Sequence, residues 1–210
     1  MWQDYFKPGI EFLVGVDEAG RGPLAGPLAL GAVLFPRSGV EALSLAMADY
    51  PAGKDSKKLT AKAREAWRAK IMSLKVEGYL DFAVSFVSPK FIDDYGMSAA
   101  LRYGLKKNLQ KLSLDPAKTR LLLDGSLRGP KEFKYQQTII KGDESELVIA
   151  LASIVAKVAR DFYLVKVAKD YPGYGLEQHK GYGTAAHCEA IVRLGPCPLH
   201  RRSFLTRLLK

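Results

Sequence analysis

Apolar residues along the chain follow two different periods, and together they predict a mixed α/β protein. Short apolar or alternating runs, each ended by glycine, proline or charged residues, predict five strands. These runs are Leu13–Val16, Leu28–Phe35, Asp81–Val87, Thr119–Leu123 and Lys134–Ile140. Three strands, helices, two more strands and a long helix follow one another along the chain. This order predicts a central sheet with both parallel and antiparallel pairs, flanked by helices.

Apolar residues at steps of three and four predict the helices. Thr60 begins one helix as its cap, and this helix runs to Leu74. We expect the longest helix to begin after Asp143, with Asp143 as its N-cap, and to reach about Asp170. The remaining predicted helices are Met97–Leu112 and Ala185–Leu194. A basic tail follows the last helix, and the glycine-rich segment from Tyr171 to Gly183 is the softest boundary that we expect.

The composition is that of a folded protein with one compact core. Hydrophobic residues make up 48% of the 210 residues, too many for a disordered chain. We see no apolar run of about 18 residues, which a membrane span requires, and no basic and apolar N-terminal signal. Cys188 and Cys197 form neither a disulfide framework nor a zinc motif, and we expect free thiols in a reducing cytoplasm.

Basic residues outnumber acidic ones by 32 to 22, which gives a formal charge of +10. Such a surface suits a polyanion, and nucleic acid suits it better than a membrane because no basic amphipathic terminal helix is evident. Many basic proteins bind no nucleic acid, so the charge needs support from specific residues.

The stretch GVDEAGRGPLAGP, from Gly15 to Pro27, combines two adjacent carboxylates with a loop of small residues. Gly20, Gly22 and Gly26 do not have the spacing of a dinucleotide-binding loop, and no Gly-Lys-Ser/Thr of a P-loop occurs. A plain tight turn remains one interpretation. The other is a loop whose backbone amides approach a ligand closely, with Arg21 beside them.

Four acidic residues follow the ends of predicted strands. Asp17 and Glu18 end the first strand, Asp124 ends a later one, and Asp143 follows the next. Strand ends in an α/β sheet meet at one edge, where four carboxylates would need a cation. Oxygen ligands favour Mg²⁺ or Mn²⁺. The alternative for each acid is an ordinary turn or helix cap.

Two basic stretches are candidate phosphate contacts. Lys57 precedes a predicted helix N-terminus within Lys54–Arg64, although this stretch also fits a solvated helix face. HKGYGT places Tyr182 in a glycine-rich loop, where its ring would lie against a sugar, while His179 fits a structural role. The residues from His200 to Arg202 are expected to form a basic tail.

Several long motifs resemble bacterial ribonuclease HII, of the type 2 ribonuclease H family. They cover nearly the whole chain, in the family's order: DEAGRGPLAGP, DSKKL, LLLDG, KGD, ASIVAKVARD, YPGYG, HKGYGT and HRRSF. The resemblance implies an RNase H-like domain over residues 1–180 and a small helical extension over 181–210. It also implies endonucleolytic cleavage of RNA in RNA–DNA hybrids, and incision 5′ of single ribonucleotides in duplex DNA, leaving 3′-OH and 5′-phosphate ends. Such incision belongs to ribonucleotide excision repair and DNA replication.

The same resemblance assigns roles to single residues. It implies that Asp17, Glu18, Asp124 and Asp143 are catalytic ligands of two Mg²⁺ or Mn²⁺ ions. It implies that Gly20, Arg21 and Gly22 read the junction through the ribose 2′-OH, and that Tyr182 packs on the following deoxyribose. Lys57 and Lys157 would contact phosphates. No sliding-clamp motif is evident, and we expect a monomer.

Two departures from the family pattern stand out. The segment from Pro36 to Lys54 is longer than expected, and Glu146 and Val148 replace the serines usual after the KGD motif. We expect Glu144 and Glu146 to make the site more negative and to change its preference between Mg²⁺ and Mn²⁺. Two other functions stay open: an RNase H-fold nuclease that cuts DNA, and a nucleic-acid-binding protein without turnover.

Overall fold

A five-stranded sheet lies at the centre of the computed structural model, which describes residues 2–50 and 59–209. Its strands lie in the order β3-β2-β1-β4-β5. The first three pair antiparallel, whereas β4 pairs parallel to β1 and β5 parallel to β4. The strands are β1 (Phe12–Ala19), β2 (Leu28–Pro36), β3 (Asp81–Val87), β4 (Thr119–Asp124) and β5 (Tyr135–Ile139). The predicted mixed sheet is therefore confirmed.

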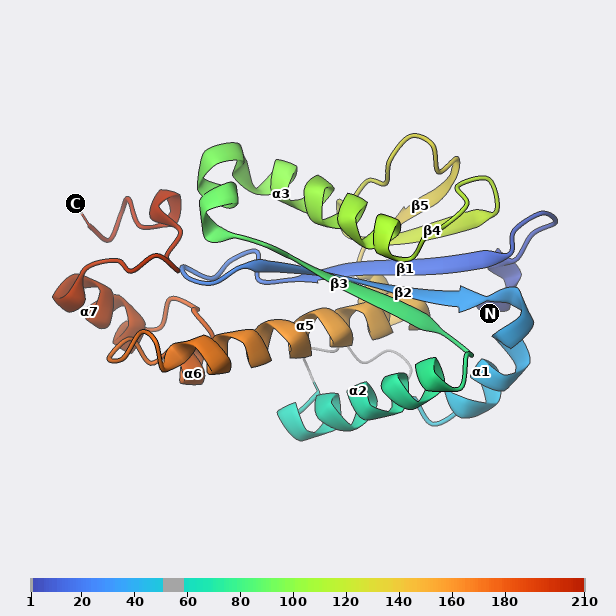
Figure 1. The fold of residues 1–210 in the computed structure, drawn as a ribbon, viewed down its shortest axis with the longest axis horizontal. Helices are drawn as coiled ribbons and strands as arrows, with labels where there is room; N and C mark the ends of the chain where they lie inside the picture. Colours follow the sequence, from blue (N-terminus) through green and yellow to red (C-terminus); the bar gives the residue numbers. More distant parts are fainter. Residues whose placement is uncertain (1, 51–58, 210) are drawn as a thin grey trace.

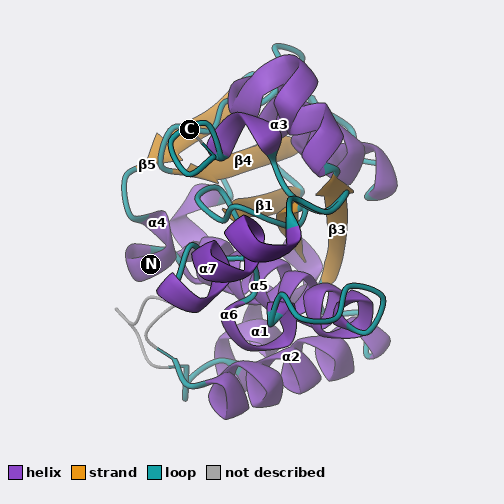
Figure 2. Ribbon diagram, turned by 90° about the vertical axis from the view of Figure 1, so that its left-hand side faces the viewer, coloured by secondary structure: helices purple, strands orange, loops and turns teal. Residues whose placement is uncertain are grey.

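Helices cover both faces of the sheet (Figures 1 and 2). On one face, α1 (Val40–Ala46), α2 (Ala61–Val76) and α5 (Leu147–Ala168) bury a core with the sheet. On the other face, α3 (Pro89–Lys111) buries a second core. Short 3-10 helices lie at Trp2–Tyr5 (η1) and Arg37–Gly39 (η2). The sheet is thus the middle layer of three, which is typical of an α/β domain.

The last part of the chain packs against the end of the sheet where β1 ends and β2 begins (Figure 1). It contains α6 (Leu176–His179), α7 (Ala185–Leu194) and the 3-10 helix η4 (Arg202–Phe204). A third apolar cluster joins these elements to Ala25, in the loop between β1 and β2. Helix α7 has the predicted bounds. Among the residues that the structure describes, no helix has the length and low charge that crossing a bilayer would need.

The prediction of the longest helix is wrong at its start. Asp143 lies inside a separate short helix, α4 (Gly142–Ser145), and does not cap α5. Lys141 adopts a left-handed conformation, with φ 55°, and Glu146 is extended. Lys141 directly precedes α4 and Glu146 separates it from α5, so Asp143 lies on a turn of its own between β5 and α5.

Helix α3 begins eight residues earlier than predicted. The Ser88 side chain accepts a hydrogen bond from the Phe91 amide, and Pro89 occupies the first turn, where its missing N–H costs nothing. Gly96, with φ 78° and ψ 165°, interrupts the helix before the predicted start at Met97. By contrast, Thr60 caps α2 as predicted, because its side chain accepts from the Ala63 amide.

Two strand glycines let α5 lie directly on the sheet. A Cβ on Gly15 would lie 2.3 Å from the Val148 carbonyl carbon, and one on Gly31 would lie 2.3 Å from the Ala152 oxygen. Both distances are far shorter than any real Cβ contact. The backbone of α5 therefore passes close to the end of β1 that carries Asp17.

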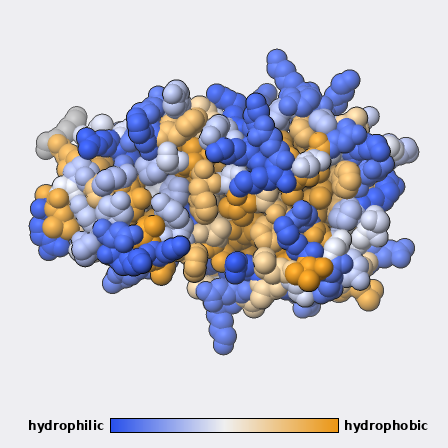
Figure 3. Space-filling view, viewed as in Figure 1, coloured by the Kyte–Doolittle hydropathy of each residue, from blue (hydrophilic) through white to orange (hydrophobic). Residues whose placement is uncertain are grey.

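Strand β3 forms one edge of the sheet, and a groove runs between it, α2 and α5. In Figure 3 the middle of this face carries apolar surface between hydrophilic margins. Phe86 and Phe162 are among its exposed apolar side chains. Lys75 and Lys111 donate to the carbonyls of Phe82 and Val84, and lysines at a sheet edge oppose the addition of another strand.

Candidate active site

Asp17 lies at the end of β1, buried beneath α5 with an exposed fraction of 1%. Alternation along the strand directs its side chain to the face that Gly15 leaves open for α5. One carboxylate oxygen accepts a hydrogen bond of 2.7 Å from the Glu18 amide. The other oxygen, Oδ2, is buried and has no hydrogen-bond partner. A buried carboxylate oxygen in this state is costly unless a cation neutralises it.

Burial, and next the negative charge of Glu18, raise the pKa of Asp17 to about 8. The charge of Asp124 acts in the same direction, whereas hydrogen bonds from the Ser153 hydroxyl and the Glu18 amide lower the pKa. The direction is the one expected for a buried carboxyl group that has other carboxylates beside it.

Asp124 occupies the matching position on the neighbouring strand. Val16 pairs with Leu123 in the parallel register of β1 and β4, so Asp17 and Asp124 lie side by side at the two strand ends. Asp124 Oδ1 accepts a hydrogen bond of 2.8 Å from the Gly142 amide, directly before Asp143. Asp124, at the end of β4, therefore anchors the start of α4, the short helix that contains Asp143.

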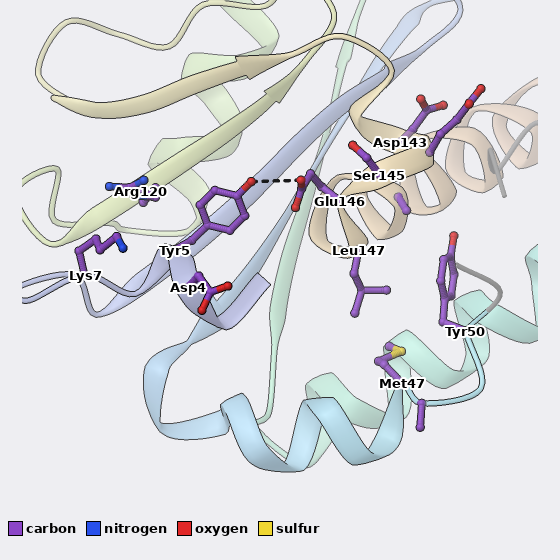
Figure 4. Close-up of a pocket in the computed structure, with 13 residues that line it drawn as sticks. Asp4, Tyr5, Lys7, Met47, Tyr50, Arg120, Asp143, Ser145, Glu146 and Leu147 are labelled. Carbon is purple, nitrogen blue, oxygen red and sulfur yellow. Dashed lines mark hydrogen bonds between the residues drawn. The ribbon is translucent and has the colours of Figure 1, made fainter. Parts of the chain in front are cut away.

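Asp143 is 5% exposed, and its neighbours place it at a cavity beside the strand ends. This cavity of about 730 Å³ is lined by residues of η1, the segment after α1, β4, α4 and the start of α5, among them Tyr5, Arg120 and Glu146. The Tyr5 hydroxyl donates to Glu146 Oε1 at 3.1 Å (Figure 4). Glu146 is therefore engaged by the N-terminal segment, a contact that a serine at this position is too short to make.

The donor chemistry at these strand ends fits a hard divalent cation. The orphaned Asp17 Oδ2 and the raised pKa of Asp17 both indicate missing positive charge, and carboxylate oxygens are the ligands that Mg²⁺ and Mn²⁺ prefer. Within residues 2–50 and 59–209, no three His, Cys, Asp or Glu side chains are already arranged to hold an ion. Asp17, Glu18 and Asp124 meet at adjoining positions, while Asp143 lines the neighbouring cavity.

Arg21 turns back onto the acid pair. Its Nε lies 2.5 Å from Glu18 Oε1, and its Nη1 lies 3.4 Å from the Ser126 hydroxyl in the loop after β4. The Glu18 side chain is 10% exposed, so this ion pair is partly shielded from water. Arg21 therefore neutralises Glu18, and through Ser126 it also joins the loop after β1 to the loop after β4.

A small cavity joins most of the predicted substrate-binding residues. It has a volume of about 220 Å³, and we call it the reading cavity. Its lining consists of Glu18, Ala19, Gly20, Arg21, Gly22, Ser153, Lys157 and Tyr182. Lys157 Nζ lies 5.6 Å from the centre of the Tyr182 ring and 2.9 Å from Asp161 Oδ1. These residues come from β1, its loop, α5 and the HKGYGT loop, so the fold gathers them beside the acids.

Lys57, the other predicted phosphate contact, lies outside the described residues.

Two arginines outside the predicted site hold the loops around this cavity. Arg160 of α5 is fully buried and donates to the carbonyls of Pro27, Ala25 and Lys180, each at 2.9 Å. It thereby joins the loop after β1 to the HKGYGT loop. Burial lowers the pKa of the Arg160 guanidinium.

Arg201 corrects the prediction of a solvated basic tail, because its side chain is fully buried. It donates to the carbonyls of Gly20 at 2.7 Å, Arg21 at 2.8 Å and Gly26 at 2.9 and 3.1 Å. Burial, and next the charge of Arg160, lower its pKa to about 10. Five guanidinium donors in a planar fork suit several carbonyls at once, which a lysine could not match.

These carbonyl contacts determine which way the loop amides point. All peptide bonds in the described chain are trans, so each N–H is directed opposite to the carbonyl of the same peptide unit. The Gly20 and Arg21 carbonyls point to Arg201, and the amides of Arg21 and Gly22 consequently point away from it. Both residues line the reading cavity.

Comparisons with known proteins agree with this architecture. Residues 14–207 match the family model described as Ribonuclease HII. The chain is 40% identical to a ribonuclease HII of Caldicellulosiruptor bescii over 96% of its length and 90% of the relative's. Among solved structures, it is similar to ribonuclease H2 of Pyrococcus horikoshii OT3, with a TM-score of 0.65, 30% identity and coverage of 94% and 97%. A Bst-RNase HIII complex with Mn²⁺ has the same fold, with a TM-score of 0.65, 18% identity and coverage of 92% and 64%.

Proposed function

We propose an activity beyond the one that the family shows. The chain belongs to the ribonuclease HII family, whose members cleave the RNA strand of RNA–DNA hybrids. We propose that it also incises DNA 5′ of single embedded ribonucleotides. The products would carry 3′-OH and 5′-phosphate ends. The expected setting of this incision is ribonucleotide excision repair during DNA replication in the cytoplasm. The observation that carries the proposal is the loop of Gly20, Arg21 and Gly22, held by the buried Arg201 directly beside Asp17 and Glu18.

Asp17, Glu18, Asp124 and Asp143 are proposed to hold two Mg²⁺ or Mn²⁺ ions. The orphaned oxygen of Asp17 supports this assignment, and so does the Mn²⁺ bound by the related Bst-RNase HIII. Bound metal would supply an activated water and a positive charge for the departing 3′ oxygen. The protein itself contributes a rigid acid pair, because the Glu18 amide fixes Asp17 and Arg21 fixes Glu18.

Recognition of the ribonucleotide is assigned to the reading cavity. The 2′-OH is the only group that distinguishes a lone ribonucleotide from its DNA neighbours, so the site must contact it. Amides of Arg21 and Gly22 are suitable donors, because no side chain stands between a glycine-rich backbone and the sugar. Arg21 adds positive charge near the neighbouring phosphate.

Tyr182 and Lys157 are proposed to hold the DNA on the far side of the junction. Tyr182 is 43% exposed, so part of its ring is free to lie on a deoxyribose. Lys157 lies between this ring and Asp161, where its ammonium group would meet a phosphate. Lys57 stays a predicted phosphate contact.

Three duplexes test the proposal: one with a single ribonucleotide, one of DNA alone, and a long RNA–DNA hybrid, each with Mg²⁺, Mn²⁺ or EDTA. We expect metal-dependent cleavage of the hybrid and one nick 5′ of the ribonucleotide. Cutting of the all-DNA duplex would favour a DNA nuclease of the same fold. Binding without cleavage in any metal would favour a protein without turnover.

Asp124→Asn tests the metal ligands, and Asp170→Asn, at an exposed acid after α5, is its matched control. We expect Asp124→Asn to abolish cleavage and leave binding to the duplex intact by fluorescence anisotropy, because the basic surface is unchanged. Cleavage at the wild-type rate by Asp124→Asn would remove this residue from the proposed site.

A further inference from the structure

The three histidines of the chain form one cluster beneath Tyr182. His187 and His200 are buried, with exposed fractions of 0% and 3%. The rings of His179 and His187 stack with centroids 4.1 Å apart, and the Nε2 atoms of His187 and His200 lie 3.1 Å apart. None of these side chains lines the reading cavity.

Backbone donors determine the protonation pattern of the buried pair. The Cys197 amide donates to His200 Nδ1 at 3.0 Å, so this nitrogen carries a lone pair. The Cys197 carbonyl, 3.3 Å from the same nitrogen, already accepts from the His200 amide. The proton of a neutral His200 is therefore on Nε2, which donates to Nε2 of His187.

His187 must then carry its own proton on Nδ1, and this group donates to the carbonyl of Tyr182 at 2.9 Å. The result is a single direction of donation, from the Cys197 amide through two imidazoles to the backbone of Tyr182. Every link is satisfied only while both rings are neutral. Burial favours the neutral form, because it lowers the pKa of His200 and lowers that of His187 to about 4.

His179 supports the same loop from the other side of Tyr182. The Gly181 amide donates to His179 Nδ1 at 3.1 Å, so the ring proton is on Nε2 and donates to the Tyr174 carbonyl at 2.7 Å. Imidazoles thus contact the Gly181 amide and the Tyr182 carbonyl, on the two sides of a residue that lines the reading cavity.

We propose that His187 and His200 are positioning residues that orient Tyr182 for recognition of the embedded ribonucleotide. This inference rests on the proposed role of Tyr182. Two neutral imidazoles supply one acceptor and one donor each, which lets a buried polar chain reach the Tyr182 carbonyl without leaving any nitrogen unsatisfied. The pair acts on the ring through the backbone and does not touch the substrate.

A double-mutant cycle on the single-ribonucleotide duplex tests this role. His187→Phe removes both hydrogen bonds, and we expect about a tenfold lower incision rate, the equivalent of one lost hydrogen bond. His187→Asn keeps a donor near the Nδ1 position and should restore part of the rate. In a Tyr182→Ala background, His187→Phe should have no further effect.

Each outcome of this cycle has one meaning. Losses that multiply in the double variant would indicate a general effect on folding and would overturn the proposal, as would a wild-type rate for His187→Phe. If the wild-type protein itself does not incise the ribonucleotide, the proposed function fails instead.

A second measurement needs neither activity nor a variant. The long-range ¹⁵N spectrum of the histidine rings at neutral pH should give His187 protonated at Nδ1 and His200 and His179 protonated at Nε2. Any other tautomer at His187 or His200 would break the chain of donation and overturn the proposal.

Discussion

Asp17→Asn should stabilise the metal-free protein, although it removes a proposed catalytic residue. The pKa of Asp17 is raised from 3.8 to about 8, so the folded state keeps a proton that the unfolded chain has lost at neutral pH. Stability related to this proton is complete below pH 3.8 and falls as the pH rises towards 8. Asparagine has the same shape but no ionisable proton, so the stability of the variant does not fall over this pH range.

The size of the effect follows from the shift in pKa. The free energy of unfolding of the wild type should fall by about 1.4 kcal/mol per pH unit over this range, relative to Asp17→Asn. The advantage of the variant at pH 7 is then about 4 kcal/mol, and it should nearly vanish at pH 4. Glu18 and Asp124 share the site, so the figure describes the acid cluster as a whole.

Urea unfolding in EDTA, followed by circular dichroism at pH 4, 5, 6 and 7, measures this difference. Asp94→Asn, at an acid that pairs on the surface with Lys90, is the control and should change stability by less than about 1 kcal/mol at any pH. Added Mg²⁺ should raise the midpoint of the wild type more than that of Asp17→Asn. Equal stability of the wild type and Asp17→Asn at pH 7 in EDTA would refute the reasoning.

Two further predictions concern residues around the site. Arg201→Lys should lower the free energy of unfolding by about 3 kcal/mol and slow incision, because one ammonium group cannot replace the guanidinium fork. Urea unfolding measures the loss, with Arg202→Lys, at the exposed neighbouring arginine, as the control. Equal stability of the two variants would contradict the prediction. Glu146→Ser should change the ratio of cleavage rates in Mg²⁺ and Mn²⁺, because it removes a charge beside Asp143. Tyr5→Phe, which keeps the charge but loses the 3.1 Å hydrogen bond, is its control, and an unchanged ratio in Glu146→Ser would rule out the charge effect.

The strands could be predicted because burial on a sheet leaves a strong local pattern. The run from Asp81 to Val87 has the predicted bounds, and the other strands differ by a few residues. The true start of α3 was missed, although Ser88 and Pro89 are a usual cap and first-turn residue. Gly96 interrupts the helical pattern, so the predicted helix began after it, at Met97. The break between α4 and α5 could not be predicted, because it depends on the extended backbone of Glu146, which no local pattern marks.

The acids of the candidate site were visible in the sequence, but their supports were not. Asp17, Glu18 and Asp124 follow strand-like runs, so topology alone brings them to one edge. Arginine side chains are usually exposed, and a sequence gives no sign that a guanidinium will be buried among carbonyls. The burial of Arg160 and Arg201 could therefore not be predicted. Their partners lie as far as 135 and 181 residues away, beyond the reach of any local pattern.

The hydrogen bond between Arg201 and the Gly20 carbonyl also sets an order of assembly during synthesis. All four acids have been synthesised once residue 143 has left the ribosome, but the loop of Gly20, Arg21 and Gly22 receives its hydrogen bonds from Arg201 only near the end of the chain. A nascent chain can therefore form its sheet before it can hold the loop that is proposed to recognise the ribonucleotide. If the proposed role of this loop holds, selectivity is the last property that this protein acquires. A chain that stops short of residue 201 then has the proposed metal ligands without the support of the loop.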